Sequence, residues 1–275
     1  MYLDYWGLRQ KPFATGRNPQ GYVPSSTHEE ALARLHYLVD SQRRLGLLLG
    51  ASGSGKSFML NVLAKQLRRP SVQTAALSLQ GLSAREMLWG LAAACGLHPD
   101  EETGAFELWR QLGDLLAANN CQAITNVVLL DDADLASSEV LGQVVRLVRG
   151  EPSSSSRLTV VLAGRSNRTL AIGPQLLELA ELRVDLAAWE LADTENYLQN
   201  SLLRAGRKES IFSAEALRRL HELSGGAVRR VALLADLALL AAAAGRLPAV
   251  DAYTVEAVYD ELGVMDALAA ADDRA

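Results

Sequence analysis

The sequence has few cysteines and no long apolar run, and each shortage excludes a class of protein. Its two cysteines, Cys95 and Cys121, lie in apolar surroundings without metal-ligand spacing, so we expect core thiols in a reducing cytoplasm. No apolar stretch approaches the roughly 18 residues that a membrane-spanning helix needs. The N-terminus also lacks the charged and apolar regions of a signal peptide. We therefore expect a cytoplasmic protein with no integral membrane segment.

Basic residues do not dominate the chain. The formal net charge is −5 at pH 7, which argues against a uniformly basic nucleic-acid-binding protein and leaves room only for a local basic stripe. Hydrophobic residues, in contrast, make up 49% of the 275 residues. This is enough to fill the core of one large domain or of two modest ones.

The most specific feature present is the segment Gly50-Ala-Ser-Gly-Ser-Gly-Lys-Ser57, which matches the phosphate-loop pattern G-x-x-x-x-G-K-[ST]. An apolar strand-like run precedes it and a helical pattern follows, as this kind of loop requires. Lys56 is expected to reach the β- and γ-phosphates of ATP, and the Ser57 hydroxyl to ligate Mg²⁺. The residues expected to contact the nucleotide here are Gly50, Ala51, Ser52, Gly53, Ser54, Gly55, Lys56, Ser57 and Phe58.

Two adjacent acids supply the second half of such a site. Asp131 and Asp132 follow the apolar run Val127–Leu130, at the C-terminal end of a predicted strand. Asp131 is expected to hold Mg²⁺, through water, as the second element of phosphate-loop sites does. Asp132 is the candidate that polarises the attacking water. Together with the loop, this pair predicts an ATP-binding and ATP-hydrolysing site.

Strand-like runs alternate with helical patterns through the first two-thirds of the chain. The runs are Leu45–Leu49, Val72–Leu79, Thr125–Leu130, Leu158–Ala163 and a weaker Leu182–Leu186. This alternation predicts an α/β fold in which helices sandwich a parallel sheet. After about Trp189 only helical patterns remain. We therefore predict an α/β nucleotide-binding domain with an N-terminal arm at residues 1–188, followed by a small all-α lid domain at residues 189–275.

Two capping boxes predict where helices begin. Thr27 with Glu30 precedes the amphipathic segment Ala31–Arg44, and Ser83 with Glu86 precedes another such segment. In each box the first side chain accepts from a backbone N–H of the first turn, while the glutamate side chain returns the bond.

Three segments outside the phosphate loop resemble one group of ATPases. They are Tyr5-Trp-Gly-Leu-Arg-Gln-Lys-Pro-Phe13, Tyr22-Val-Pro-Ser-Ser-Thr-His-Glu-Glu-Ala-Leu32 and Leu223-Ser-Gly-Gly-Ala-Val-Arg229. With the phosphate loop, they are similar to the AAA+ superfamily, and within it to the group of ExeA (GspA), TniB and TnsC. This resemblance implies a P-loop AAA+ fold with a helical lid.

The resemblance also implies roles for individual residues. Tyr22 and Val23 are candidates for packing on the adenine, with a sealing role in the core as the alternative. Arg229 corresponds to the sensor-2 residue, whose guanidinium fork suits phosphate oxygens, and Arg230 is its adjacent competitor. Val228 replaces the proline of the family pattern.

Three further positions depart from the family pattern. The family has Asp-Glu where this chain has Asp131-Asp132, and the shorter side chain places its carboxylate about 1.5 Å further away. A displacement of this size lowers a rate by about a hundredfold, so hydrolysis is expected to be slow. Sensor 1 falls on Arg165 or Asn167. Only Arg183 matches an arginine of the segment that supplies an arginine finger to a neighbouring subunit in the family.

The sequence leaves three hypotheses for the function of this nucleotide site. The first is an ExeA/TniB-like ATPase that forms nucleotide-dependent homo-oligomers, rings or filaments, to recruit or remodel partners. The second is a transposition-type ATPase that assembles on duplex DNA, and the third is a weakly hydrolysing, nucleotide-gated scaffold. Residues that would track DNA phosphates are Arg43, Arg44, Lys65–Arg69, Arg146, Arg149, Arg165 and Arg168.

Overall fold

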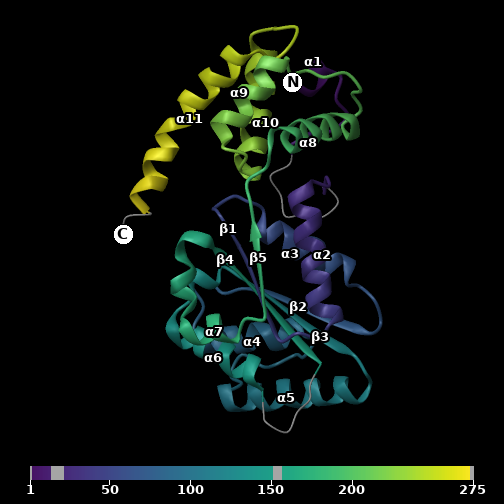
Figure 1. The fold of residues 1–275 in the computed structure, drawn as a ribbon, viewed down its shortest axis with the longest axis vertical. Coiled ribbons are helices and arrows are strands. Elements are labelled where there is room, and N and C mark those ends of the chain that lie inside the picture. Colours follow the sequence, from purple (N-terminus) through teal and green to yellow (C-terminus); the bar gives the residue numbers. More distant parts are fainter. Residues whose placement is uncertain (1, 14–21, 151–156, 273–275) are drawn as a thin grey trace. The chain divides into compact units, whose positions relative to one another are not determined.

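The computed structural model describes residues 2–13, 22–150 and 157–272. By their contacts, the residues divide into two compact units. The α/β unit comprises His28–Ser52 and Lys56–Ala187, and the helical unit comprises Met1–Thr27, Gly53–Gly55 and Ala188–Ala275. Figure 1 labels the elements of both units.

A five-stranded parallel sheet forms the centre of the α/β unit (Figure 1). Its order is β2-β3-β4-β1-β5. The strands are β1 (Leu45–Gly50), β2 (Val72–Ser78), β3 (Thr125–Asp131), β4 (Leu158–Arg165) and β5 (Leu182–Leu186). All five predicted strands are confirmed, with ends that differ by at most two residues.

Six α-helices and two short 3₁₀ segments accompany this sheet among the described residues. The helices are α2 (Ser26–Asp40), α3 (Lys56–Gln66), α4 (Ala84–Ala94), α5 (Ala105–Cys121), α6 (Ser138–Arg149) and α7 (Pro174–Leu179), and the 3₁₀ segments are η2 (Ala133–Leu135) and η3 (Ser166–Ile172). The predicted capping box of Ser83 and Glu86 is confirmed at the start of α4. The predicted box at Thr27 is wrong, because α2 already begins at Ser26 and ends at Asp40.

One face of the sheet packs against α4, α5, α6 and α7. Alternate residues of the strands, such as Leu47 and Val160, share a buried cluster with Leu91 of α4 and Val144 of α6. Residues at positions i and i+2 of a strand point to the same face, so this alternation follows from the strand geometry.

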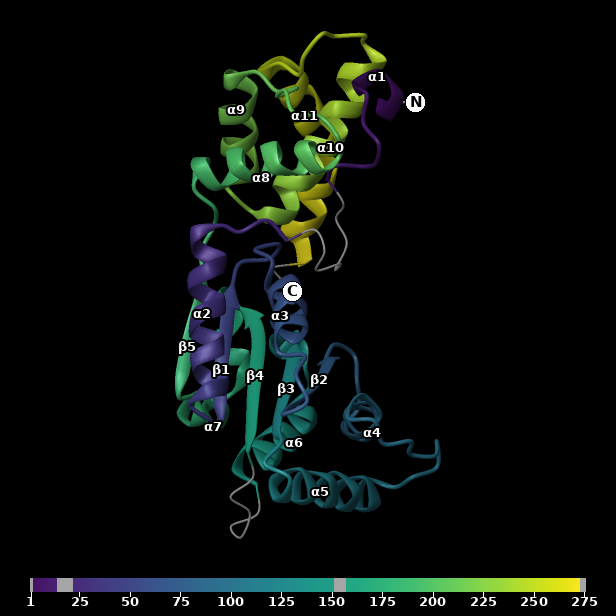
Figure 2. The same ribbon diagram turned by 90° about the vertical axis from the view of Figure 1, so that its right-hand side faces the viewer.

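Helix α2 covers β1 on the opposite face. A Cβ atom on Gly46 of β1 would stand 2.5 Å from Cδ2 of Leu38, a fully buried residue of α2. Glycine therefore allows α2 to approach β1 closely. Helix α3 also packs against the central strands, and Figures 1 and 2 show helices on both faces. The predicted α/β sandwich is confirmed.

The helical unit contains α1 (Tyr2–Trp6), α8 (Leu191–Arg204), α9 (Ala214–Ser224), α10 (Val228–Ala244) and α11 (Ala252–Asp272). Its core includes Trp6, Leu8 and Phe13 of the N-terminal arm. The Trp6 Nε1–H donates to the carbonyl of Leu239 at 2.9 Å, and the Trp189 Nε1–H donates to Oγ of Ser25 at 3.1 Å. The sequence places the arm with the α/β domain, whereas these buried anchors group it with the helical unit.

The two cysteines differ in environment. Cys95 is half-buried, and burial raises the pKa of its thiol to about 11. Cys121 is exposed at the last position of α5, so the expectation of a core thiol is wrong at this residue. Among the helices of the described residues, none is both long enough and apolar enough to cross a membrane.

The contact between Gly46 and Leu38 yields a stability prediction. Gly46→Ala should lower the free energy of unfolding by about 1–3 kcal/mol, because the added methyl overpacks a closed contact. Urea denaturation measures this. Adding Leu38→Ala should cost less than the sum of the two single changes. The matched control is Gly113→Ala in α5, where a Cβ meets nothing within 4 Å, so an equal loss there would contradict the explanation.

Candidate functional site

The phosphate loop joins β1 to α3. Gly50 is the last residue of β1 and Lys56 the first of α3. Between them, Gly53 and Gly55 adopt φ angles of 76° and 98°, which lie in the left-handed region that favours glycine. The buried Ser54 hydroxyl has no hydrogen-bond partner among the described residues. A buried polar atom without a partner fits a loop built around an anionic ligand.

Lys56 lies among the charged groups of the site. Its Nζ donates to the carbonyls of Gly50 at 2.9 Å and Ala51 at 2.8 Å. The pKa of Lys56 is lowered, mainly by burial. The nearby carboxylates of Asp131, Asp134 and Asp132 act in the opposite direction, and the guanidinium of Arg165 lowers the pKa further. Ser57 and Phe58 follow Lys56 in the first turn of α3, and both are half-buried.

The two predicted acids occupy different environments at the end of β3. Asp131 is buried, and its Oδ1 accepts a hydrogen bond from the backbone N–H of Asp132 at 3.0 Å. Asp132 has a φ of 56°, in the left-handed region. Its Oδ2 accepts from the Ser78 hydroxyl, at the end of neighbouring β2, at 2.8 Å. Ser78 therefore holds the candidate water-polarising carboxylate, a role that the sequence did not predict.

A third acid, Asp134, was also missed. It is buried and pairs with Arg165 at the end of β4: Nε of Arg165 donates to Oδ2 at 2.7 Å, and its backbone N–H donates to Oδ1 at 3.0 Å. Gly164 permits this approach, since a Cβ there would lie 3.3 Å from Oδ1 of Asp134. In the sequence, the one indication of a role for Asp134 is its position two residues after Asp132. Its proximity to Arg165 follows only from the sheet order, in which β3 and β4 are neighbours.

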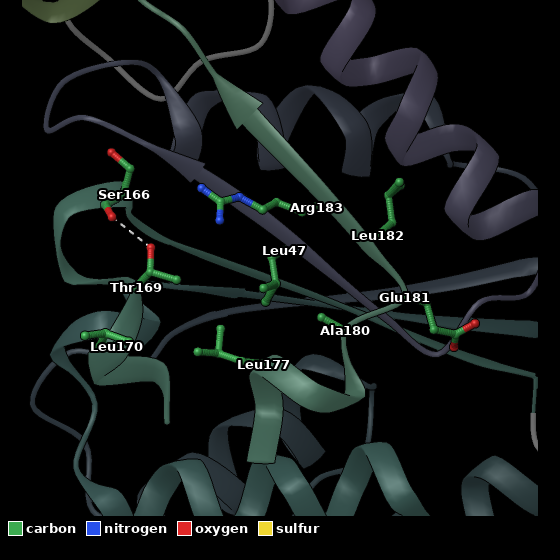
Figure 3. Close-up of a pocket in the computed structure, with 9 residues that line it drawn as sticks. All are labelled: Leu47, Ser166, Thr169, Leu170, Leu177, Ala180, Glu181, Leu182 and Arg183. Carbon is green, nitrogen blue, oxygen red and sulfur yellow. Dashed lines mark hydrogen bonds between the residues drawn. The ribbon is translucent and has the colours of Figure 1, made fainter. Parts of the chain in front are cut away.

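The other sensor-1 candidate and the arginine-finger candidate lie on exposed parts of the α/β unit. Asn167 is exposed in η3. Arg183 is exposed on β5 and pairs with Asp185 at 2.8 Å. It also lines a groove of about 560 Å³, and Figure 3 shows its side chain reaching toward Ser166. Its Nε and Nη2 are engaged by Asp185, and its role toward a neighbouring subunit stays a prediction.

Three predicted nucleotide contacts outside the phosphate loop, Arg229, Val23 and Tyr22, belong to the helical unit. The backbone N–H of Arg229 donates to the carbonyl of Gly53, which is grouped with this unit, at 3.1 Å. Its side chain is exposed. Val23 is buried, and the carbonyl of Tyr22 accepts from Arg204 at 2.6 Å. Their roles toward the γ-phosphate and the adenine stay predictions.

Several residues of the candidate DNA-tracking stripe have partners within the α/β unit. Arg43 pairs with Glu181 at 3.1 Å, and Arg69 pairs with Asp40 at 2.9 Å. Arg146 stacks over the ring of Trp109, with 4.4 Å from its Cζ to the ring centroid. These contacts give each of the three arginines a structural role that does not involve nucleic acid.

Comparison with known proteins agrees with this geometry. Residues 39–170 match the family model described as AAA domain. Over 271 residues, the chain is 33% identical to general secretion pathway protein A of Aeromonas hydrophila. The match covers 97% of this chain and 49% of the relative, so the chain spans about half of that protein's length.

Solved structures share the fold at low identity. The Aeropyrum pernix ORC1 protein in complex with DNA superposes with a TM-score of 0.67 at 17% identity, over 90% of this chain and 69% of that one. The ADPNP-ADP complexes of ORC2 from the same organism give 0.66 at 15%, over 92% and 71%. The P-loop sheet and the resemblance to ExeA are confirmed. Residues 39–170 are thus an AAA domain, and the chain is an ExeA-like AAA+ protein.

Proposed function

We propose that this chain binds Mg-ATP at Gly50–Ser57, hydrolyses it slowly in the cytoplasm and forms nucleotide-dependent homo-oligomers that recruit or remodel partners. The cluster around Lys56 is the observation that supports this most directly. One ammonium, three carboxylates and one guanidinium gather beyond the C-terminal ends of parallel strands, where α/β sheets bind ligands. The A. hydrophila relative, which is named for general secretion, makes secretion machinery a candidate partner class.

Each residue of the cluster has a role in this proposal. Backbone N–H groups of the loop and the Lys56 ammonium would bind the phosphates, in place of the loop carbonyls that Lys56 now contacts. Ser57 and Asp131 are the oxygen donors that would hold Mg²⁺, and their hard oxygen ligands fit this ion. When bound, Mg²⁺ neutralises charge on the phosphates.

Asp132 would accept a proton from the attacking water. Its carboxylate is one methylene closer to the backbone than a glutamate would place it, and the Ser78 hydroxyl holds it at 2.8 Å. Both features favour slow turnover. The nucleotide-gated scaffold, in which ATP binding rather than hydrolysis controls assembly, is the limiting case of the same site.

Arg165 is the better candidate for sensor 1. It ends β4 beside Gly50 of β1 in the sheet register, and Asp134 orients its guanidinium, whereas Asn167 is exposed in η3. Arg229 would report the nucleotide state to the helical unit. Arg183 would serve a neighbouring subunit.

Replacing Lys56 tests the nucleotide site. Lys56→Ala should weaken ATP affinity at least about a hundredfold, because the half-buried ammonium is the main cation available to the phosphates. Isothermal titration calorimetry measures this. Lys65→Ala, which removes an exposed lysine from the same helix, should bind ATP like the wild type. Unchanged affinity of the Lys56 variant would refute the assignment.

Lengthening Asp132 tests the cause of slow turnover. Asp132→Glu should raise the rate of phosphate release several-fold or more, because the carboxylate moves about 1.5 Å toward the position usual in AAA+ proteins. Asp132→Asn should lower the rate while ATP still binds. A slower Asp132→Glu enzyme would mean that the site is built around aspartate.

A duplex-DNA binding assay separates the second hypothesis from the first. Binding that requires ATP and weakens steeply as salt rises would support a DNA-bound assembly. The ion pairs of Arg43 and Arg69 favour the opposite result. We therefore expect no retention of DNA with ATP, with ADP or without nucleotide, even at low salt. The relation to a DNA-bound ORC1 fold is the observation that motivates the assay.

A further inference from the structure

An apolar groove lies beside β2, at an edge of the sheet. It measures about 430 Å³ and is lined by Leu77, Leu82, Arg85, Glu86, Trp89, Gly90 and Glu101. Its apolar part is formed by Leu77 of β2, by Leu82, which precedes α4, and by Trp89 of α4, and all three are half-buried. Figure 2 shows β2, α4, α5 and the connection between the two helices.

The outer wall of the groove is attached to α4 by two side chains. The Trp89 Nε1–H donates to the carbonyls of Pro99 at 3.1 Å and Asp100 at 3.2 Å. Arg85 donates to the carbonyls of Thr103, at 3.2 Å, and Glu101. These bonds hold the α4–α5 connection in one position and engage the guanidinium of Arg85 with backbone oxygens.

The surface beside the groove is acidic. Asp100, Glu101 and Glu102 are consecutive and exposed, and none forms an ion pair with the residues that the structure describes. Glu86 adds a fourth carboxylate, used only in the capping box of α4. Against these four charges Arg85 provides one cation. An apolar groove with an acidic rim complements an apolar segment that carries basic residues.

The edge position of β2 gives such a segment access. Within the described five-stranded sheet, β2 is the end strand and its one neighbouring strand is β3, while Val72 at its start also forms an isolated bridge with Arg69. Edge strands that remain open are frequent sites for binding extended peptides. Gly90 brings α4 close to this edge, because a Cβ there would lie 3.1 Å from Cδ1 of Leu77. The groove is therefore formed by the packing of α4 on β2.

We propose that this groove docks a short segment of a protein partner, in which an apolar side chain enters between Leu77, Leu82 and Trp89 and flanking lysines or arginines face the acidic rim. The inference does not depend on ATP hydrolysis. The proposed function does not specify the partner, and this inference states which residue types its binding segment would contain.

A random heptapeptide library displayed on phage, selected on the immobilised full chain, tests this. The enriched peptides should carry an apolar residue flanked by lysine or arginine. A synthetic copy of the most enriched peptide should bind in a fluorescence anisotropy titration, more weakly as salt rises. Leu82→Ser should weaken this binding about tenfold, the factor expected for losing one buried leucine contact.

Glu101→Lys is the second variant, and its exposed position keeps folding intact. It should also weaken the peptide. The matched controls are Leu170→Ser and Asp114→Lys, which change an exposed leucine and an exposed acid elsewhere in the α/β unit, and both should bind like the wild type. ATP affinity, measured on all four variants, should stay unchanged, so failure of the groove and failure of the nucleotide site are distinguishable.

Three results would overturn the proposal. The first is a selection without basic, apolar peptides, and the second is equal peptide binding by the groove and control variants. The third is a loss of self-association in the groove variants, seen by light scattering, while no peptide binds. That third result would make a second copy of this chain the occupant.

Discussion

The register of the parallel strands is the constraint on which the site depends. Strand β1 lies between β4 and β5, and β3 lies on the other side of β4. The pairing Gly50 with Arg165, and Ser78 with Asp131, aligns the ends of these strands. Lys56, the acids and the guanidinium of Arg165 therefore lie together beyond the C-terminal ends of the strands, although they are far apart in the sequence. A shift of one residue would turn each side chain to the other face.

Charge balance around Lys56 follows from this alignment. Burial disfavours the ammonium, and the carboxylates of Asp131, Asp134 and Asp132 favour it. Asp134 and Arg165 are paired with each other, and they act on the pKa of Lys56 in opposite directions. In the proposed function, Asp131 would hold the metal ion and Asp132 would act on water, so two residues of the same type would have different roles because of their positions.

Prediction from sequence worked where the signal is local. The phosphate loop is one continuous segment, the strands are short apolar runs, and the capping box at Ser83 spans three residues. It was wrong at Thr27, where the helix begins one residue earlier, and at Cys121, because apolar neighbours in the chain do not bury a residue at a helix end. Neither error changes the fold, since the pattern of buried strands decides it.

The sequence by itself determined the fold class, the nucleotide loop and the acids at the end of β3, because each depends on residues adjacent in the chain. Only the tertiary structure decided that Ser78 holds Asp132, that Asp134 holds Arg165 and that the N-terminal arm belongs to the helical unit. Those contacts join residues from separate elements or from opposite ends of the chain. Packing, which no local pattern records, brings them together.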